Sequence, residues 1–360
     1  MQVAARANPG AGADVVAAAV AAPGLAKSQR NSRPVRTTPT QGPAYATRPD
    51  VMQQAQDIAE RRDLDPQWVR DTLAQAHQMP QAIRLIAPPP VGTPKNWQAY
   101  RNRFIEPIRI RAGVQFWQAN RAALERAQAE YGVPPEIIVG VIGVETIYGQ
   151  QTGNFRVLDV LTTLAFDFPA AHPRAVERSA FFRAELEQFL SLMQRTGTAA
   201  THPRGSYAGA MGLPQFMPSS WARYAIDFDG DSRVDLHASA ADAIGSVANY
   251  FQAYGWQADM PTHYTLQFDA ATLDLEGLLL PDILPTFSVA ALAAKGAIVD
   301  AAGAEHRGPL ALVELQNGNA APSYVIGTEN FYVITRYNWS SYYAMAVIEL
   351  GQAVAQALPK

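Results

Sequence analysis

The pattern of apolar and polar positions divides the N-terminal third of the chain into two parts. Residues 27–48 mix Pro, Ser, Thr, Gln and Arg without an apolar period, which predicts a linker rather than a folded segment. Residues 49–133 contain residues that are typical of helix starts. Asp50 is a candidate N-cap, and Asp65 followed by Pro66 is typical of a helix start. We therefore expect a helical domain over 49–133.

The pattern changes twice more toward the C-terminus. Residues 134–256 stay mostly helical, with Pro and Gly at the boundaries, whereas residues 257–335 contain short apolar runs between Gly, Asn and Pro. Such runs predict a small β-containing module. They are Tyr264–Phe268, Phe287–Val289, Ala311–Leu315 and Tyr324–Ile326. Residues 336–360 return to a helical pattern over Tyr342–Leu358.

The most informative segment runs from Pro134 to Gly149. Pro135 suits a first helical turn, and Gly149 is expected to end the helix. Between them apolar residues cover every face: Ile137, Ile138, Val139, Val141, Ile142, Val144 and Ile147. A helix that is apolar all round is a buried helix.

Glu145 is then a carboxyl group near the end of a core helix. Burial without a charged partner raises the pKa of a carboxyl toward neutrality, and a carboxyl that stays protonated near pH 7 can act as a general acid. The alternative is a structural glutamate that pairs with an arginine or caps a neighbouring turn. Burial alone leaves both interpretations open.

No second acid lies beside Glu145 in the sequence. Glu136 is nine residues away, on the opposite helix face and about 13 Å along the axis. Glycosidases normally use two carboxylates about 5–10 Å apart. Asp159 and Asp167 lie beyond the helix and remain candidates for a second acid.

An acidic loop follows further along the chain. Asp227, Asp229, Asp231 and Asp235 occupy alternating positions with the oxygen-ligand spacing of an EF-hand, and the carbonyl of Arg233 falls in the seventh place. The usual glycine and the closing glutamate are replaced by Ser232 and Ala238. A solvated acidic turn is the alternative to a metal site.

Composition excludes several classes of function. A formal net charge of −3 gives no electrostatic footprint for nucleic acid. The absence of cysteine excludes disulfides, thiolate zinc sites, cysteine nucleophiles and an N-terminal lipid-attachment cysteine. No apolar run is long enough to span a bilayer. Residues 1–48 are interpreted as a disordered tail or a residual targeting segment, since Val15–Ala26 resembles a signal-peptide core although Asp14 precedes it.

Several long motifs in order resemble one family of enzymes. They begin with Gly143–Gly149 (GVETIYG) and continue through Asn154–Ala165 (NFRVLDVLTTLA), Ser206–Trp221 (SYAGAMGLPQFMPSSW), Asp242–Trp256 (DAIGSVANYFQAYGW) and Thr335–Val347 (TRYNWSSYYAMAV). Together these motifs are similar to those of the membrane-bound lytic murein transglycosylase B family, of glycoside hydrolase family 103 type. The resemblance extends from about residue 50 to residue 350.

The resemblance implies a mainly α fold: a goose-type-lysozyme-like helical catalytic core over 134–256, with additional helices and a small β-containing module. It implies that Glu145 is the catalytic acid/base. By matching, the glycan cleft is lined by Tyr100, Ser206, Gln215, Tyr250, Tyr337, Asn338 and Tyr343. It also implies a loop over 227–242 that Asp242 closes and that holds a structural Ca²⁺, with no cofactor needed for the chemistry. Leu213-Pro214 departs from the aromatic and glycine that many relatives carry there.

The implied reaction is non-hydrolytic cleavage of the β-1,4 bond between N-acetylmuramic acid and N-acetylglucosamine, which leaves 1,6-anhydromuramic ends. Peptidoglycan glycan strands are the implied partner, together with proteins of cell-wall synthesis or secretion. The implied location is the periplasm of a Gram-negative bacterium, in a soluble or peripherally associated form. Two alternatives stay open. One is a hydrolytic muramidase that uses Asp159 or Asp167, and the other is a non-catalytic peptidoglycan-binding scaffold.

Overall fold

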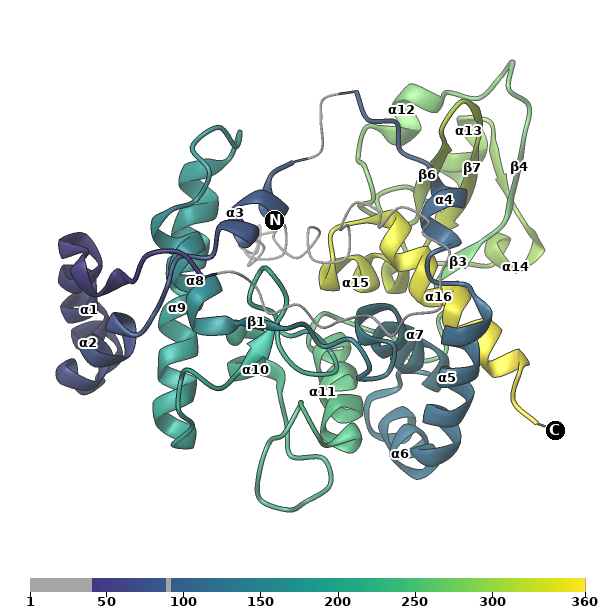
Figure 1. The fold of residues 1–360 in the computed structure, drawn as a ribbon. Coiled ribbons are helices and arrows are strands. Elements are labelled where there is room, and N and C mark those ends of the chain that lie inside the picture. The colour runs from purple at the N-terminus through teal and green to yellow at the C-terminus, as the bar shows by residue number, and fades with distance from the viewer. Residues whose placement is uncertain (1–40, 89–91, 360) are drawn as a thin grey trace, which may run out of the picture.

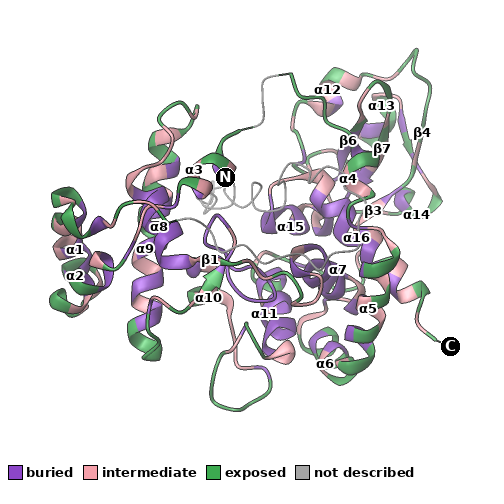
Figure 2. Cartoon of the chain, viewed as in Figure 1, coloured by how far each residue is buried: buried purple, intermediate pink, exposed green. Residues whose placement is uncertain are grey.

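The computed structural model describes residues 41–88 and 92–359, and within them the chain is mainly helical (Figure 1). The targeting segment and most of the linker expected in the N-terminal region lie outside the described residues. Three groups of buried side chains organise the rest, and Figure 2 marks the buried residues along the chain in purple. None of the described helices is long and apolar enough to cross a membrane.

The central group surrounds helix α7 (Pro135–Thr146), which packs most extensively on the C-terminal helix α16 (Ser341–Gln356). The other helices of this group are α4 (Trp97–Arg101), α5 (Pro107–Ala119), α6 (Arg121–Tyr131), α11 (Ala240–Ala253) and α15 (Glu329–Tyr337). Segments from both ends of the sequence therefore meet around α7. Ten of its twelve residues are buried, as its apolar sequence predicts.

A second group builds the part of the molecule on the left of Figure 1. It contains the 3₁₀-helix η2 (Tyr45–Thr47) and the helices α1 (Pro49–Arg62), α2 (Pro66–Ala74), α3 (Pro80–Ile86), α8 (Val157–Phe166) and α9 (Ala175–Thr196). The short helix α10 (Pro218–Tyr224) contacts α9 and α11 and so bridges the two groups. Between them, strands β1 (Phe155–Arg156) and β2 (Arg204–Gly205) pair antiparallel.

The third group is the β-containing module. Strands β3 (His263–Tyr264), β7 (Ala320–Gly327) and β6 (Ala311–Asn317) form an antiparallel sheet in that order, and β4 (Leu266–Phe268) pairs with β5 (Ala297–Val299). The short helices α12 (Leu275–Leu279), α13 (Val289–Ala294) and α14 (Ala301–Ala304) complete it. Three of the four predicted strand runs are strands. The fourth contributes only a bridge from Phe287 to Leu310 before α13.

Three local predictions are wrong. Residues 41–48 do not form a linker, because the backbone of Gly42 and Tyr45 bonds to the segment after α2 and the Tyr45 side chain is buried. Asp50 is not the N-cap of α1. It lies in the first turn, after Arg48, to which its carboxylate is paired. Gly149 does not end the apolar helix, since α7 stops at Thr146.

Candidate active site

The end of α7 presents Glu145 at the edge of the central core. Thr146 and Val144 beside it are buried, whereas Glu145 as a residue is partly exposed. The Thr146 hydroxyl lies 2.9 Å from the carbonyl oxygen of Leu213, to which it donates a hydrogen bond. This bond ties the end of α7 to the loop over residues 205–217. Helix and loop thus fix the backbone that carries Glu145.

The only hydrogen-bond partner recorded for the Glu145 carboxyl among the described residues is a neutral phenol. The hydroxyl of Tyr343, in the first turn of α16, donates to Oε1 of Glu145 at 2.7 Å. Burial raises the pKa of Glu145 from 4.5 to about 8, and the bond from Tyr343 offsets only part of that rise. A carboxyl with this pKa is mostly protonated at neutral pH, which is the state a general acid needs.

Buried tyrosines form a wall beside this carboxyl. The rings of Tyr337 and Tyr343 stack with centroids 6.1 Å apart, and Tyr250 packs on Tyr337 at 4.9 Å. The hydroxyl of Tyr337 donates to the carbonyl of Pro214 at 2.5 Å, and that of Tyr250 donates to the carbonyl of Arg336 at 2.6 Å. These tyrosines are packing residues as well as candidates for the cleft.

Tyr100 approaches the site from α4. It is partly exposed, and its ring packs against Trp97, Phe104 and Tyr342 at centroid distances of 5.0–6.3 Å. Burial raises the pKa of Tyr100, and the negative charge of Glu145 raises it further, which places the two side chains near each other. The structure therefore brings Tyr100, Tyr337 and Tyr343 together around Glu145.

The remaining polar candidates for the cleft are compared by their exposure and by the hydrogen bonds that they already make within the protein. Ser206 is half-buried, and its hydroxyl accepts hydrogen bonds from the backbone of Ala208 and Ala210, so it shapes its own turn. Gln215 is buried in a left-handed conformation, with its amide donating to the carbonyls of Thr152 and Gly212.

Asn338 is the polar side chain with spare hydrogen-bonding capacity. It directly follows α15 and is 1 % exposed. Its side-chain oxygen has no hydrogen-bond partner within the described part of the chain. A buried acceptor without a partner is unusual in a folded protein and indicates a place for a ligand or a water molecule.

Asp159, one of the two candidate second acids, is already bound by hydrogen bonds and an ion pair within the protein. It is fully buried on α8, where its carboxylate accepts hydrogen bonds from the side chain of Gln41 at 3.1 Å and the backbone of His77 at 3.0 Å. Arg156 pairs with the same carboxylate. A carboxylate held in this way by three donors has no contact with bulk water.

Asp167, the other candidate, follows the end of α8 and belongs to the second core. Its carboxylate accepts from the Tyr45 hydroxyl, from the Arg48 guanidinium at 3.0 Å and from the Gln78 amide at 2.9 Å. Burial raises its pKa, but these hydrogen bonds outweigh burial and the pKa of Asp167 is lowered. The carboxylates of both aspartates are thus hydrogen-bonded to groups of the N-terminal helices and their connecting segments.

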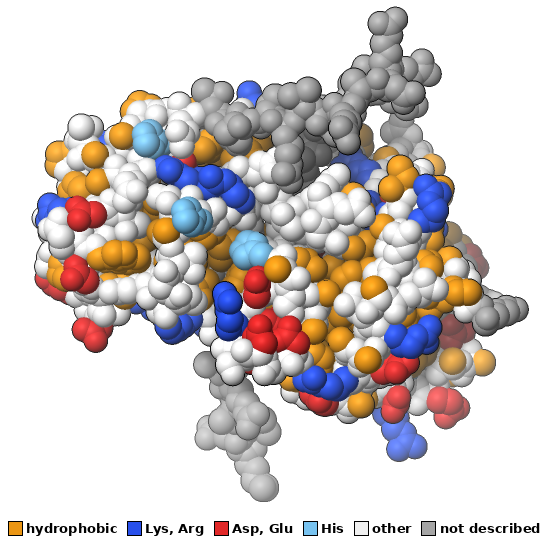
Figure 3. Space-filling model, turned by 60° about the horizontal axis from the view of Figure 1, so that its bottom comes forward, with side chains coloured by type: hydrophobic (Ala, Val, Ile, Leu, Met, Phe, Trp, Pro, Cys, Tyr) orange, Lys and Arg blue, Asp and Glu red, His pale blue; other side chains and the backbone are white. Residues whose placement is uncertain are grey.

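The acidic loop over residues 227–242 lies below α10 and α11 in Figure 1. Turned to the front in Figure 3, this side of the molecule shows a cluster of acidic side chains. Carboxylate oxygens of Asp227, Asp229 and Asp242 lie within 4.8 Å of one another. Asp242 is buried at the start of α11 and accepts from the backbone of Phe228, Asp229 and Asp235. Hard oxygen donors at this spacing suit Ca²⁺.

The other predicted ligands do not join this cluster. The carboxylate of Asp231 accepts from the backbone of Arg233, and that of Asp235 accepts from the backbone of His237 and Ala238. Ser232, in the place of the usual glycine, adopts the left-handed conformation that an EF-hand requires there, with φ of 70°. The loop therefore keeps the bend of an EF-hand while only three carboxylates converge.

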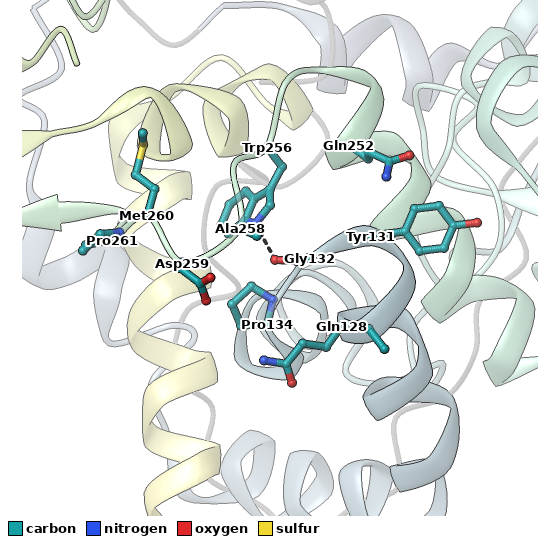
Figure 4. Close-up of a pocket in the computed structure, with 11 residues that line it drawn as sticks. Gln128, Tyr131, Gly132, Pro134, Gln252, Trp256, Ala258, Asp259, Met260 and Pro261 are labelled. Carbon is teal, nitrogen blue, oxygen red and sulfur yellow. Dashed lines mark hydrogen bonds between the residues drawn. The ribbon is translucent and has the colours of Figure 1, made fainter. Parts of the chain in front are cut away.

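A cavity of about 600 Å³ lies away from this chemistry, between the ends of α6 and α11 (Figure 4). Its wall includes Pro134, next to the start of α7, whereas Glu145 lies at the other end of that helix, about 15 Å along the axis. The indole nitrogen of Trp256 donates to the carbonyl of Gly132 across the wall. Among the remaining lining residues most are exposed, so the cavity is shallow.

Sequence patterns missed two groups that shape the site. The carbonyls of Leu213 and Pro214 accept hydrogen bonds from Thr146 and Tyr337, and so connect the loop to α7 and α15. Backbone acceptors carry no side-chain signal, although Leu213-Pro214 was noticed as a departure from relatives. The turn after Glu145 was also missed, because Ile147 and Tyr148 are unexpected in left-handed backbone.

Comparisons with known proteins agree on one family. Residues 47–352 match the family described as the transglycosylase SLT domain. Over 327 residues, the chain is 40% identical to membrane-bound lytic murein transglycosylase B of Escherichia coli strain K12, and this match covers 88% of the chain and 85% of the relative.

Solved structures resemble the chain over most of its length. The lytic transglycosylase Slt35 of Escherichia coli in complex with calcium superposes with a TM-score of 0.76 at 39% identity, and covers 91% of this chain and 99% of its own. SltB3 of Pseudomonas aeruginosa in complex with NAG-anhNAM-pentapeptide superposes with a TM-score of 0.68 at 27% identity, and covers 85% of this chain and 81% of its own. The expected lysozyme-like helical fold is confirmed by this likeness.

Proposed function

Since this chain belongs to the lytic murein transglycosylases with an SLT domain, we propose that it cleaves peptidoglycan glycan strands with Glu145 as the single catalytic acid/base. The observation that carries the proposal is the state of that carboxyl. Glu145 is partly exposed as a residue, yet burial raises the pKa of its carboxyl to about 8, and the hydrogen bond that this carboxyl receives within residues 41–88 and 92–359 comes from the neutral Tyr343.

The first step breaks the bond between C1 of N-acetylmuramic acid and the bridging oxygen to N-acetylglucosamine. Protonated Glu145 gives its proton to that oxygen, so the leaving sugar departs as a neutral alcohol. The carboxyl becomes a carboxylate, and positive charge develops at C1 and the ring oxygen. Tyr343 orients the carboxyl and stabilises the carboxylate as it forms, because its hydroxyl already donates to Oε1.

The second step forms the 1,6-anhydro ring. The C6 hydroxyl of the same muramic residue attacks C1, and its proton passes to the carboxylate of Glu145. The acid is regenerated, and no water enters the products. Because the substrate supplies its own nucleophile, the reaction needs no second carboxylate.

The engagement of Asp159 and Asp167 supports this route over hydrolysis. A hydrolytic muramidase would need one of them to activate water, and both are bound to structural donors in the second core. A non-catalytic scaffold is disfavoured by Glu145 itself, because a protein that only binds glycan gains nothing from a desolvated carboxyl at the end of a core helix.

The glycan groove is proposed to run past the tyrosines around Glu145. Tyr100 and Ser206 are the accessible members of the set, and suit contact with a sugar face and a hydroxyl. Asn338 offers the acceptor that lacks a partner within the described residues. The other members, Gln215, Tyr250, Tyr337 and Tyr343, are buried and form the wall behind the groove.

We also propose that the loop over 227–242 binds a structural Ca²⁺. Asp227, Asp229 and Asp242 would supply the first oxygens, and Asp231, Asp235 and the carbonyl of Arg233 are the further ligands that the EF-hand spacing suggests. Three carboxylates held close together repel one another unless a cation lies between them. The calcium complex of Slt35 supports this assignment.

The substrate sets the location that we propose. Peptidoglycan of Gram-negative bacteria lies in the periplasm, so the enzyme acts there on glycan strands during wall remodelling and turnover. The peptidoglycan fragment bound by SltB3 supports a substrate that carries stem peptides.

A digest of purified sacculi, analysed by mass spectrometry, tests the proposed function. The account expects muropeptides that end in 1,6-anhydromuramic acid, each lighter by one water than the product of a hydrolase. Reducing muramic ends would favour the muramidase, and undigested sacculi would favour the scaffold.

A further inference from the structure

The turn that follows Glu145 has an unusual backbone. Helix α7 ends at Thr146, and the next three residues, Ile147, Tyr148 and Gly149, all have positive φ, at 50°, 55° and 87°. A left-handed conformation is ordinary for glycine but unfavourable for a β-branched or aromatic residue. Strained backbone of this kind persists only where surrounding contacts hold it in place, and it concentrates at functional sites.

The side chain of Tyr148 provides such contacts. It folds back between α5 and α7, where its ring packs against Phe116 with centroids 5.2 Å apart. Its hydroxyl is buried and has no hydrogen-bond partner among the described residues. Burial raises the pKa of this phenol, and the nearby cation of Arg109 lowers it in part. The phenol is therefore held by packing rather than by a polar partner.

Two glycines make the space for this ring. A Cβ on Gly113 of α5 or on Gly143 of α7 would collide with the hydroxyl and the adjoining ring carbon of Tyr148. Neither glycine has a positive φ, and both lie inside helices, where glycine is less stable than alanine. Backbone conformation thus gives no reason for glycine at either position. The phenol end of Tyr148 does, together with α16, whose Val354 and Leu350 side chains would also collide with a Cβ on Gly113 and on Gly143, respectively.

We propose that Tyr148 is a positioning residue for Glu145. Its ring fills the slot between Gly113 and Gly143 and so locks the left-handed turn that directly follows the catalytic carboxyl. With the turn locked, the last turn of α7 keeps Glu145 in its apolar surroundings and against the hydroxyl of Tyr343. The role belongs to the ring, because the hydroxyl of Tyr148 bonds to nothing in the described structure.

The inference rests on the proposed function, in which Glu145 must be protonated and held in place. The groups that face Glu145 are Tyr343 from α16, Tyr100 from α4 and Tyr337 from α15. None of these phenols titrates near neutral pH, since burial raises the pKa of each. The pH at which activity falls on the alkaline side therefore reports the environment of Glu145.

The test compares Tyr148→Leu with Tyr148→Phe in turnover of saturating sacculi. Leucine meets the same backbone strain but leaves the slot unfilled, so we expect turnover to fall about a hundredfold, as misplacement of a reacting group does, with the half-saturating amount of sacculi nearly unchanged. The alkaline limb of the pH profile should move to lower pH by about one unit, because the freed carboxyl is better solvated. Phenylalanine should retain wild-type turnover and the wild-type profile.

Phe189→Leu is the matched control. Phe189 is a fully buried aromatic residue on α9, in the second core. Its loss should lower the melting temperature without moving the pH profile of the folded enzyme. If Tyr148→Leu changes only the melting temperature, as Phe189→Leu does, the positioning role is refuted. Glu145→Gln, run beside it, separates the two ideas, because an inactive Glu145→Gln with a normal Tyr148→Leu leaves the proposed function intact.

A second variant keeps the test decisive if Tyr148→Leu does not fold. Gly143→Ala pushes on the tyrosine hydroxyl from α7, so turnover should fall in this variant too. Adding Tyr148→Phe removes the atom nearest to the new methyl group and should restore part of the activity. If the double variant is no more active than Gly143→Ala alone, the ring does not act through this slot and the proposal is wrong.

Discussion

Helices α7 and α8 carry carboxylates in similar apolar settings, yet the two carboxylates have opposite surroundings. Glu145 lies at the end of α7 and receives one bond from a neutral phenol. Asp159 lies in the first turn of α8 and is met by Arg156, by the amide of Gln41 and by the backbone of His77. Both helices are almost entirely buried.

The difference shows that burial alone does not make an acid catalytic. Where donors and a cation compensate the charge, as around Asp159, the carboxylate is a structural anion that joins distant segments. Where compensation is left incomplete and one side stays open, as at Glu145, desolvation raises the pKa and the proton becomes available to a substrate. We therefore expect removal of the two carboxyls to affect different properties of the enzyme.

Glu145→Gln should have the largest effect. The amide keeps the shape and can still accept from Tyr343, but it cannot deliver a proton to the leaving oxygen. One positioned acid/base contributes about 10²–10⁴ in rate, and here one group serves both proton transfers, so we expect a loss of about 10⁴ or more. Release of anhydromuropeptides from sacculi measures it. Retained activity with an unchanged fold would remove Glu145 from the mechanism.

Asp159→Asn should show the reverse behaviour. The substitution leaves Arg156 without its counter-charge in a largely buried place, and breaking such a pair costs about 3 kcal/mol. Urea denaturation should show that loss, while turnover per folded molecule stays close to that of the wild type. A stable but inactive Asp159→Asn enzyme would make Asp159 a catalytic group and revive the hydrolytic alternative.

The pH dependence of the free energy of unfolding should reveal the raised pKa of Glu145. The pKa of Glu145 is raised from 4.5 to about 8, so between these values the folded enzyme binds more protons at this site than the unfolded chain does. Its contribution to stability is present below about pH 4.5 and is lost as the pH rises toward 8. The melting temperature of the wild type should therefore fall relative to that of Glu145→Gln over this window. A constant difference across the window would show that the pKa is ordinary.

Removal of the proposed calcium should have the smallest effect, because the proposed mechanism assigns no chemical step to the loop over 227–242. A bound ion stabilises the folded state by mass action, and a loss of about 1 kcal/mol lowers the melting temperature by about 1–2 °C in a chain of 360 residues. EDTA should produce a shift of this order in the wild type, and none in Asp227→Asn. Asp269→Asn, an exposed acid outside the loop, is the control that should keep the response.

The sequence predicted the parts of the site that depend on local pattern. The apolar faces of 134–149 predicted a buried helix with Glu145 near its end. The alternating acids at 227–235 predicted a cation loop, in which Asp227 and Asp229 converge with Asp242, whereas the left-handed bend at Ser232 was not predicted. These features follow from residues a few positions apart. The same is true of most strands in the β-containing module.

The rest depends on residues far apart in the chain. Tyr343, the partner of Glu145, comes 198 residues later, and Gln41 comes 118 residues before Asp159. No periodicity in a single sequence pairs such positions. Residues 41–48 were predicted to be a linker because one buried aromatic, Tyr45, gives no repeating signal. The left-handed turn at Ile147 opposes the preference of its own residue, and Tyr148 in that turn packs against Phe116 of α5, a residue distant in the sequence.

A digest of sacculi in water enriched in oxygen-18 distinguishes attack by the C6 hydroxyl from attack by water. If the C6 hydroxyl of the substrate is the nucleophile and Glu145 accepts its proton, no solvent oxygen enters the glycan products. We expect unlabelled anhydromuropeptides from the wild type and no products from Glu145→Gln. Muropeptides with labelled oxygen at C1 of muramic acid would show that water is the nucleophile and would contradict the single-acid mechanism.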